Sequence, residues 1–315
     1  MSIRRIFLIF AAALITCTGY SAFNNLDYSA RTFGMGSASV AIFDDYSSIY
    51  ACPAGLSALK TWQVGLSYSR LNLLTADIGE SYIALAYPLK QYGTLGFGWY
   101  NMGDLVYSET IYTLAYSFSA MNSSVGVNIK FMTKAYTSNE WTTINSEYFT
   151  ALSKSVLSFG FSISSQVLRD ISIGFFIDDF NEPDIGISAE ERLPVTLKGG
   201  LAYRMKDTVA GFEVVSRADV LKFQIGAESS GLKLGDFGMF SFRLGSGFGP
   251  NSYLNLTAGM GIRFNPGLAG LGMSFDYGFM FPFGFAGGNA GTHKASLTIT
   301  EMYRDLMKNP QEEAK

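Results

Sequence analysis

The sequence contains a single histidine, His293, and only two cysteines, Cys17 and Cys52. A catalytic triad or a metal site needs several histidine, cysteine or acidic side chains at matching spacings, and no such partners accompany His293. We therefore expect no metal, no cofactor and no enzymatic activity, and we interpret His293 as a structural residue of a strand. If Cys17 is removed with a leader, no internal disulfide is possible, and Cys52 is then a small buried residue.

Charge and long apolar runs are also scarce. Charged residues make up 16% of the chain, below the roughly 25% of soluble domains, whereas aromatic residues reach 15%. Beyond the N-terminus no stretch has the roughly 18 consecutive apolar residues of a membrane-spanning helix. The net charge of −3, without a long basic stretch, argues against nucleic-acid binding. The many apolar residues must alternate with others, which is typical of strands.

The first residues have the composition of an export signal. Arg4 and Arg5 precede a short apolar run, and small and polar residues follow it. The run is too short to span a membrane, so residues 1–22 are predicted to be a signal peptide that is cleaved at or near Ser21. Lipoprotein processing at Cys17 is an open alternative.

From about Thr61 the hydrophobic pattern has a period of two residues. Large apolar residues alternate with small or polar ones, for example at Leu95, Phe97 and Trp99. Several such segments reach ten residues or more, whereas soluble strands usually have about five or six. A strand tilted through a bilayer needs about 9–11 residues, and hydrocarbon offers no partner to an open sheet edge. The sequence therefore predicts an all-β transmembrane fold, a closed antiparallel β-barrel.

We predict about fourteen strands. They lie near 61–71, 79–89, 93–103, 107–118, 122–135, 157–168, 170–179, 193–205, 208–217, 221–229, 237–247, 253–264, 269–280 and 292–303. Segment 146–155 is either a further strand or a short helix on a loop. Tyr and Trp residues near strand ends, including Tyr100 and Tyr277, are expected in aromatic girdles at the two membrane interfaces.

Residues 23–60 have a different, mixed character. Asp44 and Asp45 are expected to open a short helix and to act as its N-terminal charges, and Pro53 and Gly55 break it. We predict that residues 23–60 form a plug with short helices inside a barrel formed by residues 61–303. Residues 304–315 are polar and are expected to form a periplasmic tail.

The most specific pattern lies between Arg31 and Leu56. A Gly-Met-Gly turn is followed by an Asp-Asp pair and then by Pro-Ala-Gly-Leu. The residues concerned are Gly34, Met35, Gly36, Asp44, Asp45, Pro53, Ala54, Gly55 and Leu56. The stretch resembles the N-terminal signature of the PorV and FadL-like outer-membrane barrels, with Cys52 in place of their usual Asn. The segments at 192–204, 259–264 and 291–297 resemble later strands of PorV relatives.

This resemblance implies a bacterial outer-membrane protein surrounded by lipid. FadL-like barrels carry hydrophobic small molecules passively past an N-terminal plug, which is our main hypothesis for function. Phe33, Met35, Phe281 and Phe283 are the candidates for binding such a molecule. For Phe281 and Phe283 the alternative is a lipid-facing or loop position.

Transport has four alternatives. PorV-like proteins are adaptors that bind secreted proteins at the cell surface, in which case the loops at 136–156 and 180–192 would be the binding surface. A purely structural surface barrel is a further alternative. A phosphate-binding loop at Gly34–Gly36 is disfavoured because the Lys-Ser/Thr pair of such loops is missing. A calcium site at Asp44 and Asp45 has no support beyond the two carboxylates.

Overall fold

The computed structural model describes most of the chain. The described residues are 22–23, 27–71, 78–145, 151–233, 238–250, 253–267, 270–283 and 291–303. The predicted tail at 304–315, and all but the last residue of the predicted signal peptide, fall outside them and stay predictions.

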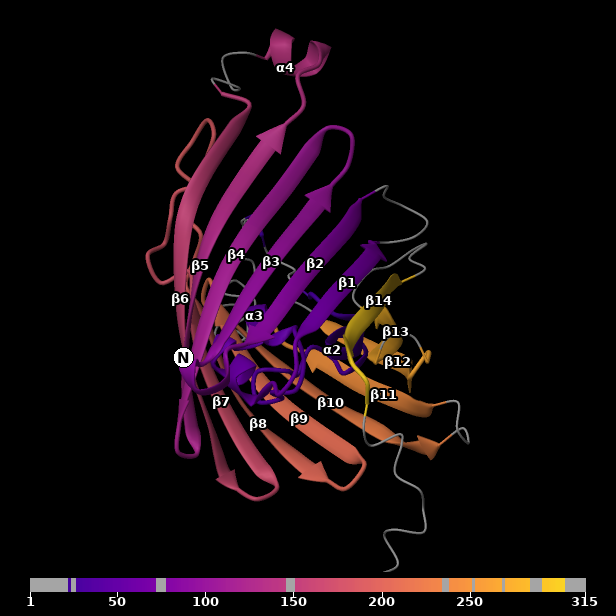
Figure 1. Ribbon diagram of the computed structural model, residues 1–315. Coiled ribbons are helices and arrows are strands. Elements are labelled where there is room, and N and C mark those ends of the chain that lie inside the picture. Colours follow the sequence, from indigo (N-terminus) through magenta and orange to yellow (C-terminus); the bar gives the residue numbers. More distant parts are fainter. Residues whose placement is uncertain are drawn as a thin grey trace, which may run out of the picture.

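Within these residues, fourteen antiparallel strands form one closed barrel, in which each strand is bonded to its sequence neighbours and the last is bonded to the first (Figure 1). The strands are β1 (Gln63–Arg70), β2 (Gly79–Pro88), β3 (Thr94–Gly103), β4 (Tyr107–Ala120), β5 (Ser123–Tyr136), β6 (Ser153–Leu168), β7 (Ile171–Asp178), β8 (Thr196–Met205), β9 (Thr208–Arg217), β10 (Val220–Lys233), β11 (Met239–Phe248), β12 (Leu254–Phe264), β13 (Leu271–Pro282) and β14 (Thr292–Glu301). Each lies where the period-two pattern predicts a strand, so the predicted closed antiparallel barrel is confirmed.

The two ends of the barrel differ. At the turn end, β1 begins, β14 ends, and short connections join β4 to β5 and β8 to β9. The connection from β2 to β3 at this end holds a short helix, η2 (Lys90–Tyr92). At the loop end, long connections join β5 to β6 and β7 to β8. The first of these carries α4 (Glu140–Ile144), which lies above the extended strands β4 to β6 in Figure 1.

Region 146–155, for which a strand and a helix were both open, is divided by the structure. Residues 146–150 lie outside the described residues, and the last three residues of the region belong to β6. The described helices are all short, and none has the length and apolar character needed to cross a membrane.

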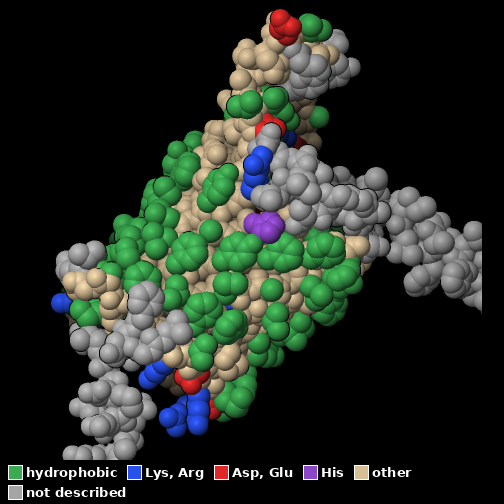
Figure 2. Space-filling view, turned by 90° about the vertical axis from the view of Figure 1, so that its right-hand side faces the viewer, with side chains coloured by type: hydrophobic (Ala, Val, Ile, Leu, Met, Phe, Trp, Pro, Cys, Tyr) green, Lys and Arg blue, Asp and Glu red, His purple; other side chains and the backbone are tan. Residues whose placement is uncertain are grey.

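The outward side chains of the barrel are overwhelmingly apolar. Figure 2 shows one face of this surface, where hydrophobic side chains form a broad band. Leu114 and Leu244 are 62% and 70% exposed. Soluble monomers rarely expose contiguous apolar patches larger than a few hundred Å². The wall is therefore suited to contact with hydrocarbon, which is consistent with an outer-membrane barrel. Tyr100, predicted in an aromatic girdle, is instead 1% exposed and faces the lumen, because it shares the inward face of β3.

Residues 27–59, which we call the inner segment, lie inside the barrel (Figure 1). They contain three short helices, namely α2 (Ala30–Gly34), α3 (Ser48–Ala51) and η1 (Pro53–Ala58). The segment touches the barrel backbone directly, because glycines occupy inward positions of many strands. A Cβ added to Gly226 would lie 2.0 Å from the carbonyl oxygen of Met35. A Cβ added to Gly126 would lie 2.2 Å from the amide nitrogen of Ala54.

These close contacts predict the effect of adding one methyl group to the wall. We expect Gly226→Ala to destabilise the folded protein by about 1–3 kcal/mol, the usual cost of overpacking, because the backbone of Met35 must move. Gly199→Ala is the control, since its Cβ would meet only the Phe175 ring at 3.8 Å. Thermal unfolding in detergent, followed by circular dichroism, measures the difference. Equal midpoints for the two variants would contradict direct packing of the inner segment on the wall.

Candidate functional site

The lumen has a charged side and an apolar side. The inner segment lies between them and contacts both. Strands β8 to β14 carry most of the charged groups that face α2, whereas β2 to β6 carry a row of buried apolar side chains. The charged side fixes the position of the inner segment.

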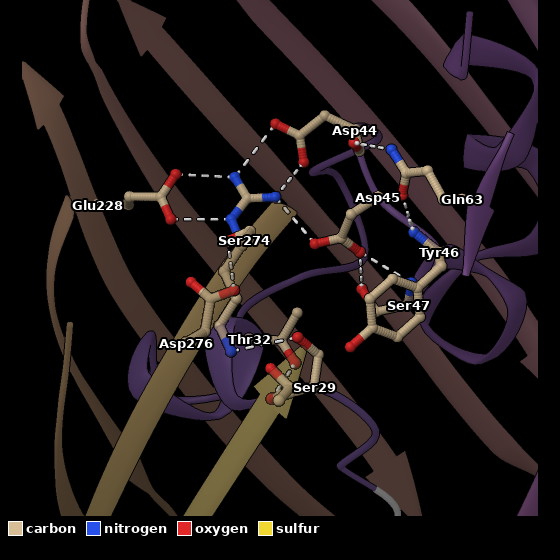
Figure 3. A network of polar contacts seen from close by, with 12 residues as sticks. Ser29, Thr32, Asp44, Asp45, Tyr46, Ser47, Gln63, Glu228, Ser274 and Asp276 are labelled. Atoms are coloured by element: carbon tan, nitrogen blue, oxygen red, sulfur yellow. Dashed lines mark hydrogen bonds and ion pairs between the residues drawn. The ribbon is translucent and has the colours of Figure 1, made fainter. Parts of the chain in front are cut away.

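Arg31 in α2 is the centre of the charged side, and its three carboxylate partners Asp44, Asp45 and Glu228 are labelled in Figure 3. Its Nε and Nη2 atoms donate to the two carboxylate oxygens of Glu228 on β10, both at 2.8 Å. Its Nη1 atom donates to Asp45 at 2.9 Å, and the guanidinium also bonds Asp44. Ser29 caps α2 by accepting a hydrogen bond from the Arg31 amide, which fixes the start of the helix. Arg31 therefore connects two parts of the inner segment to the barrel wall. These parts are α2, which contains Arg31 itself, and the pair Asp44-Asp45.

A second arginine extends this network within the wall. Arg243 on β11 donates to Glu228 at 2.6 Å and lies 2.7 Å from a carboxylate oxygen of Asp276 on β13. Arg204 on β8 donates to Asp44 at 2.9 Å, with its side chain half exposed. These groups border a cavity of about 300 Å³ at the turn end. The network is a structural anchor, because each carboxylate in it is paired with an arginine.

The prediction that Asp44 and Asp45 are helix N-terminal charges is wrong. α3 begins only at Ser48, its first turn contains no acidic residue, and both carboxylates bind Arg31 instead. The burial of Asp44 alone would raise the pKa of its carboxyl, but the adjacent Arg31 outweighs burial and holds that pKa below its ordinary value.

The apolar side is built around one row of inward side chains. The row consists of Tyr82, Tyr100, Ile111, Met132 and Val156, one residue on each strand from β2 to β6, each directly opposite the next in the strand register. The first four are at most 3% exposed. On the inner segment, Tyr28 stacks on Tyr50 at 3.7 Å between ring centroids and packs against both tyrosines of the row.

This apolar cluster continues towards both ends of the barrel. Ile49, Leu56 and Leu59 of the inner segment extend it towards the turn end. At the loop end it includes Phe23 together with Ile185 and Leu193 of the connection between β7 and β8. An apolar column thus runs along β2 to β6, and a second apolar cluster, which includes Met35, Phe176 and Val209, lies against β7 to β9.

The loop end of this column is closed by the chain itself. Phe23 is 1% exposed, and its amide donates to a carboxylate oxygen of Glu109 at 2.9 Å. Ile185 and Leu193 are fully buried, so the connection between β7 and β8 folds partly over the lumen. Other residues of the loop at 180–192, such as Phe180, are exposed, and the alternative of an adaptor surface there stays a prediction. A backbone bridge between Asp184 and Arg192 closes that loop on itself.

At the turn end of the column, the hydrogen bonds that join η1 to β4, β5 and β6 within the described residues are uncharged. Ala54 in η1 accepts a bond from Ser117 at 2.9 Å and donates one to Ser162 at 2.8 Å. Ser57 donates to Ser124 at 2.6 Å. Beside these contacts lies a cavity of about 400 Å³, bordered by side chains of η1 and of the ends of β4, β5 and β6. η1 is therefore attached to the wall by hydroxyl groups, in contrast to the ion pairs of α2.

All residues of the predicted signature lie in the inner segment. Gly34 approaches Gly259 of β12, where its Cβ would lie 3.0 Å from that Cα, and Gly36 has a positive φ of 66°. The remaining signature residues connect the charged side to the apolar side. They are Met35, Asp44, Asp45, Pro53, Ala54, Gly55 and Leu56. Cys52 is buried among them, and this burial raises the pKa of its thiol to about 12.

The four candidate ligand-binding residues lie in two different places. Phe33 and Met35 are buried in the inner segment, and Lys294 lies over the Phe33 ring at 5.4 Å from its centroid. Phe281 is 40% exposed on the outward face of β13, and Phe283 is 53% exposed just beyond that strand. Phe281 thus has the lipid-facing position that was the alternative, and the structure does not bring these four residues together.

The apolar row is the functional feature that the sequence analysis missed. The signal was present as pairs of adjacent large apolar residues, which break the alternation at one position in consecutive strands. The pairs are Tyr82-Ile83, Trp99-Tyr100, Ile111-Tyr112, Phe131-Met132 and Val156-Leu157. In each pair one residue faces lipid and the other faces the lumen, since successive side chains of a strand point to opposite faces.

The closed wall, apolar outside and filled inside by its own N-terminal segment, defines a class, the transmembrane barrel with an occupied lumen. No protein-family model matches the sequence, and a comparison with curated protein sequences finds no match either.

Solved structures show which barrels share this fold. The toluene transporter TodX of Pseudomonas putida has a TM-score of 0.60 at 11% identity, over 90% of this chain and 100% of its own. The toluene transporter TbuX of Ralstonia pickettii has a TM-score of 0.57 at 11% identity, over 90% and 100%. A FadL homologue of Pseudomonas aeruginosa has a TM-score of 0.56 at 10% identity, over 90% and 99%. The chain has the fold of these channels, and its relation to PorV stays a prediction.

Proposed function

We propose that this protein is an outer-membrane channel for the passive transport of hydrophobic small molecules and that the inner segment is its plug. The observation that carries the proposal is the apolar column along β2 to β6. An aqueous pore for polar solutes has no use for a buried row of Tyr82, Tyr100, Ile111 and Met132 in its lumen. The fold supports the same conclusion, since TodX and TbuX are toluene transporters.

The orientation follows from the lengths of the connections. In outer-membrane barrels short turns face the periplasm and long loops face the exterior. The turn end is then periplasmic and the loop end extracellular. A hydrophobic molecule would enter near Phe23 and leave near η1, along the apolar column.

The attachments of the inner segment indicate which part of it moves. Charge-assisted bonds such as those of Arg31 are roughly twice as strong as neutral hydrogen bonds. On the apolar side, η1 is attached by the hydroxyl groups of Ser117, Ser124 and Ser162. The route therefore opens by displacement of η1 from β4 to β6, while α2 stays anchored to β10 through Arg31 and Glu228.

Uptake measurements test the proposed function. Cells that produce the protein should take up radiolabelled toluene faster than cells that lack it. Uptake of a disaccharide of similar or larger size should be equal in the two strains, which controls for general leakage. Equal rates of toluene uptake would reject the transport function.

The position of Phe23 gives a sharper prediction. Phe23→Ala should leave an apolar cavity at the loop end of the column, and apolar cavities stay dry and bind small apolar molecules. The variant loses about 3–5 kcal/mol of stability by the usual cost of such truncations, and toluene should restore part of it. Toluene should therefore raise the unfolding midpoint of Phe23→Ala more than that of the wild type. Phe180→Ala, at a ring 52% exposed, is the control and should respond as the wild type does. A wild-type response from Phe23→Ala would mean that the ring does not occupy a ligand position.

A further inference from the structure

Two consecutive backbone nitrogens, those of Ala22 and Phe23, face carboxylates at the loop end of the lumen. The Ala22 nitrogen donates to Oε1 of Glu191 at 3.0 Å. The Phe23 amide donates to Oε2 of Glu109 at 2.9 Å. Glu109 lies on β4, whereas Glu191 belongs to the connection between β7 and β8. Two distant parts of the barrel therefore meet at two neighbouring residues, which are 9% and 1% exposed.

The charges around these two nitrogens are not balanced. Glu191 is paired with Lys134 on β5, with 2.5 Å between Oε2 and Nζ. Among the described residues, no lysine or arginine forms an ion pair with Glu109, which accepts bonds from the Phe23 amide and the Tyr107 hydroxyl. Two carboxylates thus have one lysine between them in a site with little water. A buried charge without an opposite charge is costly, so one more positive charge would stabilise this site.

Further contacts fix the position of the Ala22 nitrogen. The carbonyl oxygen of Ala22 lies 3.5 Å from Nη2 of Arg217, a residue whose charge is paired with Asp179. Phe23 has a φ of 60°, a left-handed conformation that bulky residues rarely adopt. Such a conformation persists only where the surroundings hold the chain. The carboxylates therefore face a nitrogen whose place is set from both sides.

We propose that a signal peptidase cuts the bond between Ser21 and Ala22, and that Glu191 binds the α-ammonium group of the new N-terminus. Gly19 and Ser21 are the small residues expected three and one positions before such a cut. Hydrolysis adds one water to the peptide bond, so Ser21 leaves as a carboxylate and Ala22 keeps an amine. This amine takes up a proton at neutral pH. The ammonium then supplies the missing positive charge, and Ala22 stays in the mature protein although the predicted signal peptide, 1–22, includes it.

Processing and closure of the loop end are then linked. Ala22 is buried beneath the connection between β7 and β8, so the cut must precede closure of that connection. An uncut chain has a neutral amide with one N–H donor at this place, whereas the ammonium has a charge and three donors. The loop end therefore closes completely only in the processed protein. The proposal depends on the fold of the loop end and not on what passes through the lumen.

The N-terminus of the protein purified from outer membranes tests the site of the cut. Edman sequencing should begin at Ala22. The bound α-amine should then react slowly with an amine-reactive ester at about pH 7, where free α-amines react before lysines. Glu191→Gln should raise this labelling rate about tenfold, as expected for loss of one charge-assisted hydrogen bond. Mass spectrometry of the N-terminal peptide measures the rate.

Two matched variants separate binding of the terminus from other effects. Glu190→Gln changes the neighbouring carboxylate, which is 63% exposed and paired with Arg192, and should keep the slow rate. Lys134→Gln removes the other partner of Glu191 and should keep it too. If Glu191→Gln does not fold, the folded wild type is compared with the same protein unfolded in guanidinium. A first residue other than Ala22, or equal labelling rates in either comparison, would overturn the proposal.

Discussion

A disulfide between Ser57→Cys and Ser124→Cys should abolish the uptake of hydrophobic molecules. The two hydroxyl oxygens lie 2.6 Å apart, so cysteines at these positions can form a bond with little movement. The bond would fix η1 to β5 at the turn end of the apolar column. Because we propose that η1 must leave the wall for passage, toluene uptake should fall to the rate of cells without the protein. A reductant should restore it.

A matched disulfide controls for the chemistry of cross-linking. Ser230 and Ser241 lie on adjacent wall strands with their hydroxyl oxygens 3.1 Å apart, so Ser230→Cys, Ser241→Cys joins the wall only to itself. Its oxidised form should transport at the wild-type rate. Undiminished uptake by the oxidised Ser57→Cys, Ser124→Cys protein would rule out movement of η1, even if the protein is a transporter. Loss of uptake in both cross-linked proteins would point to general damage by oxidation.

The barrel could be predicted from the sequence because its cause is local. Alternation along a strand depends only on which face each residue joins, and a wall between lipid and lumen enforces it in all fourteen strands. The interior could not be predicted in the same way. Arg31 and Glu228 are separated by 197 positions, and nothing in either neighbourhood indicates the other. Only closure of the barrel around the inner segment brings them together.

The apolar row could be predicted from the sequence only in part. Its residues are visible in the sequence as apolar pairs such as Trp99-Tyr100, but the pairs gain meaning only through strand register. Once Tyr100 is known to lie opposite Ile111, and Ile111 opposite Met132, the pairs become one surface. Phe23 could not be assigned from the sequence, since its burial depends on the fold of the distant loop that carries Ile185 and Leu193.

Replacement of Arg31 should cost more stability than any other single change on the charged side. Its side chain is 14% exposed and bonds three carboxylates, so Arg31→Met leaves buried negative charges facing one another. Loss of one partner of a buried ion pair typically costs about 3–5 kcal/mol. Arg204→Gln is the control, because its side chain is 53% exposed and such pairs contribute about 0–1 kcal/mol. The thermal midpoint in detergent should fall far more for Arg31→Met.

The pH dependence of these variants tests the cause of the loss. Arg31 holds the pKa of Asp44 below its ordinary value, so the stability from this pair is complete above that value and is lost as the pH falls through the lowered pKa. Acidification from about pH 6 to about pH 2 should therefore destabilise the wild type. The Arg31→Met variant should lose less stability over the same pH range, because without the guanidinium the burial of Asp44 favours its protonated carboxyl. If the stability of the two proteins depends on pH in the same way, Arg31 acts by packing alone. The inner segment would then have no electrostatic anchor that could hold α2 in place while η1 moves.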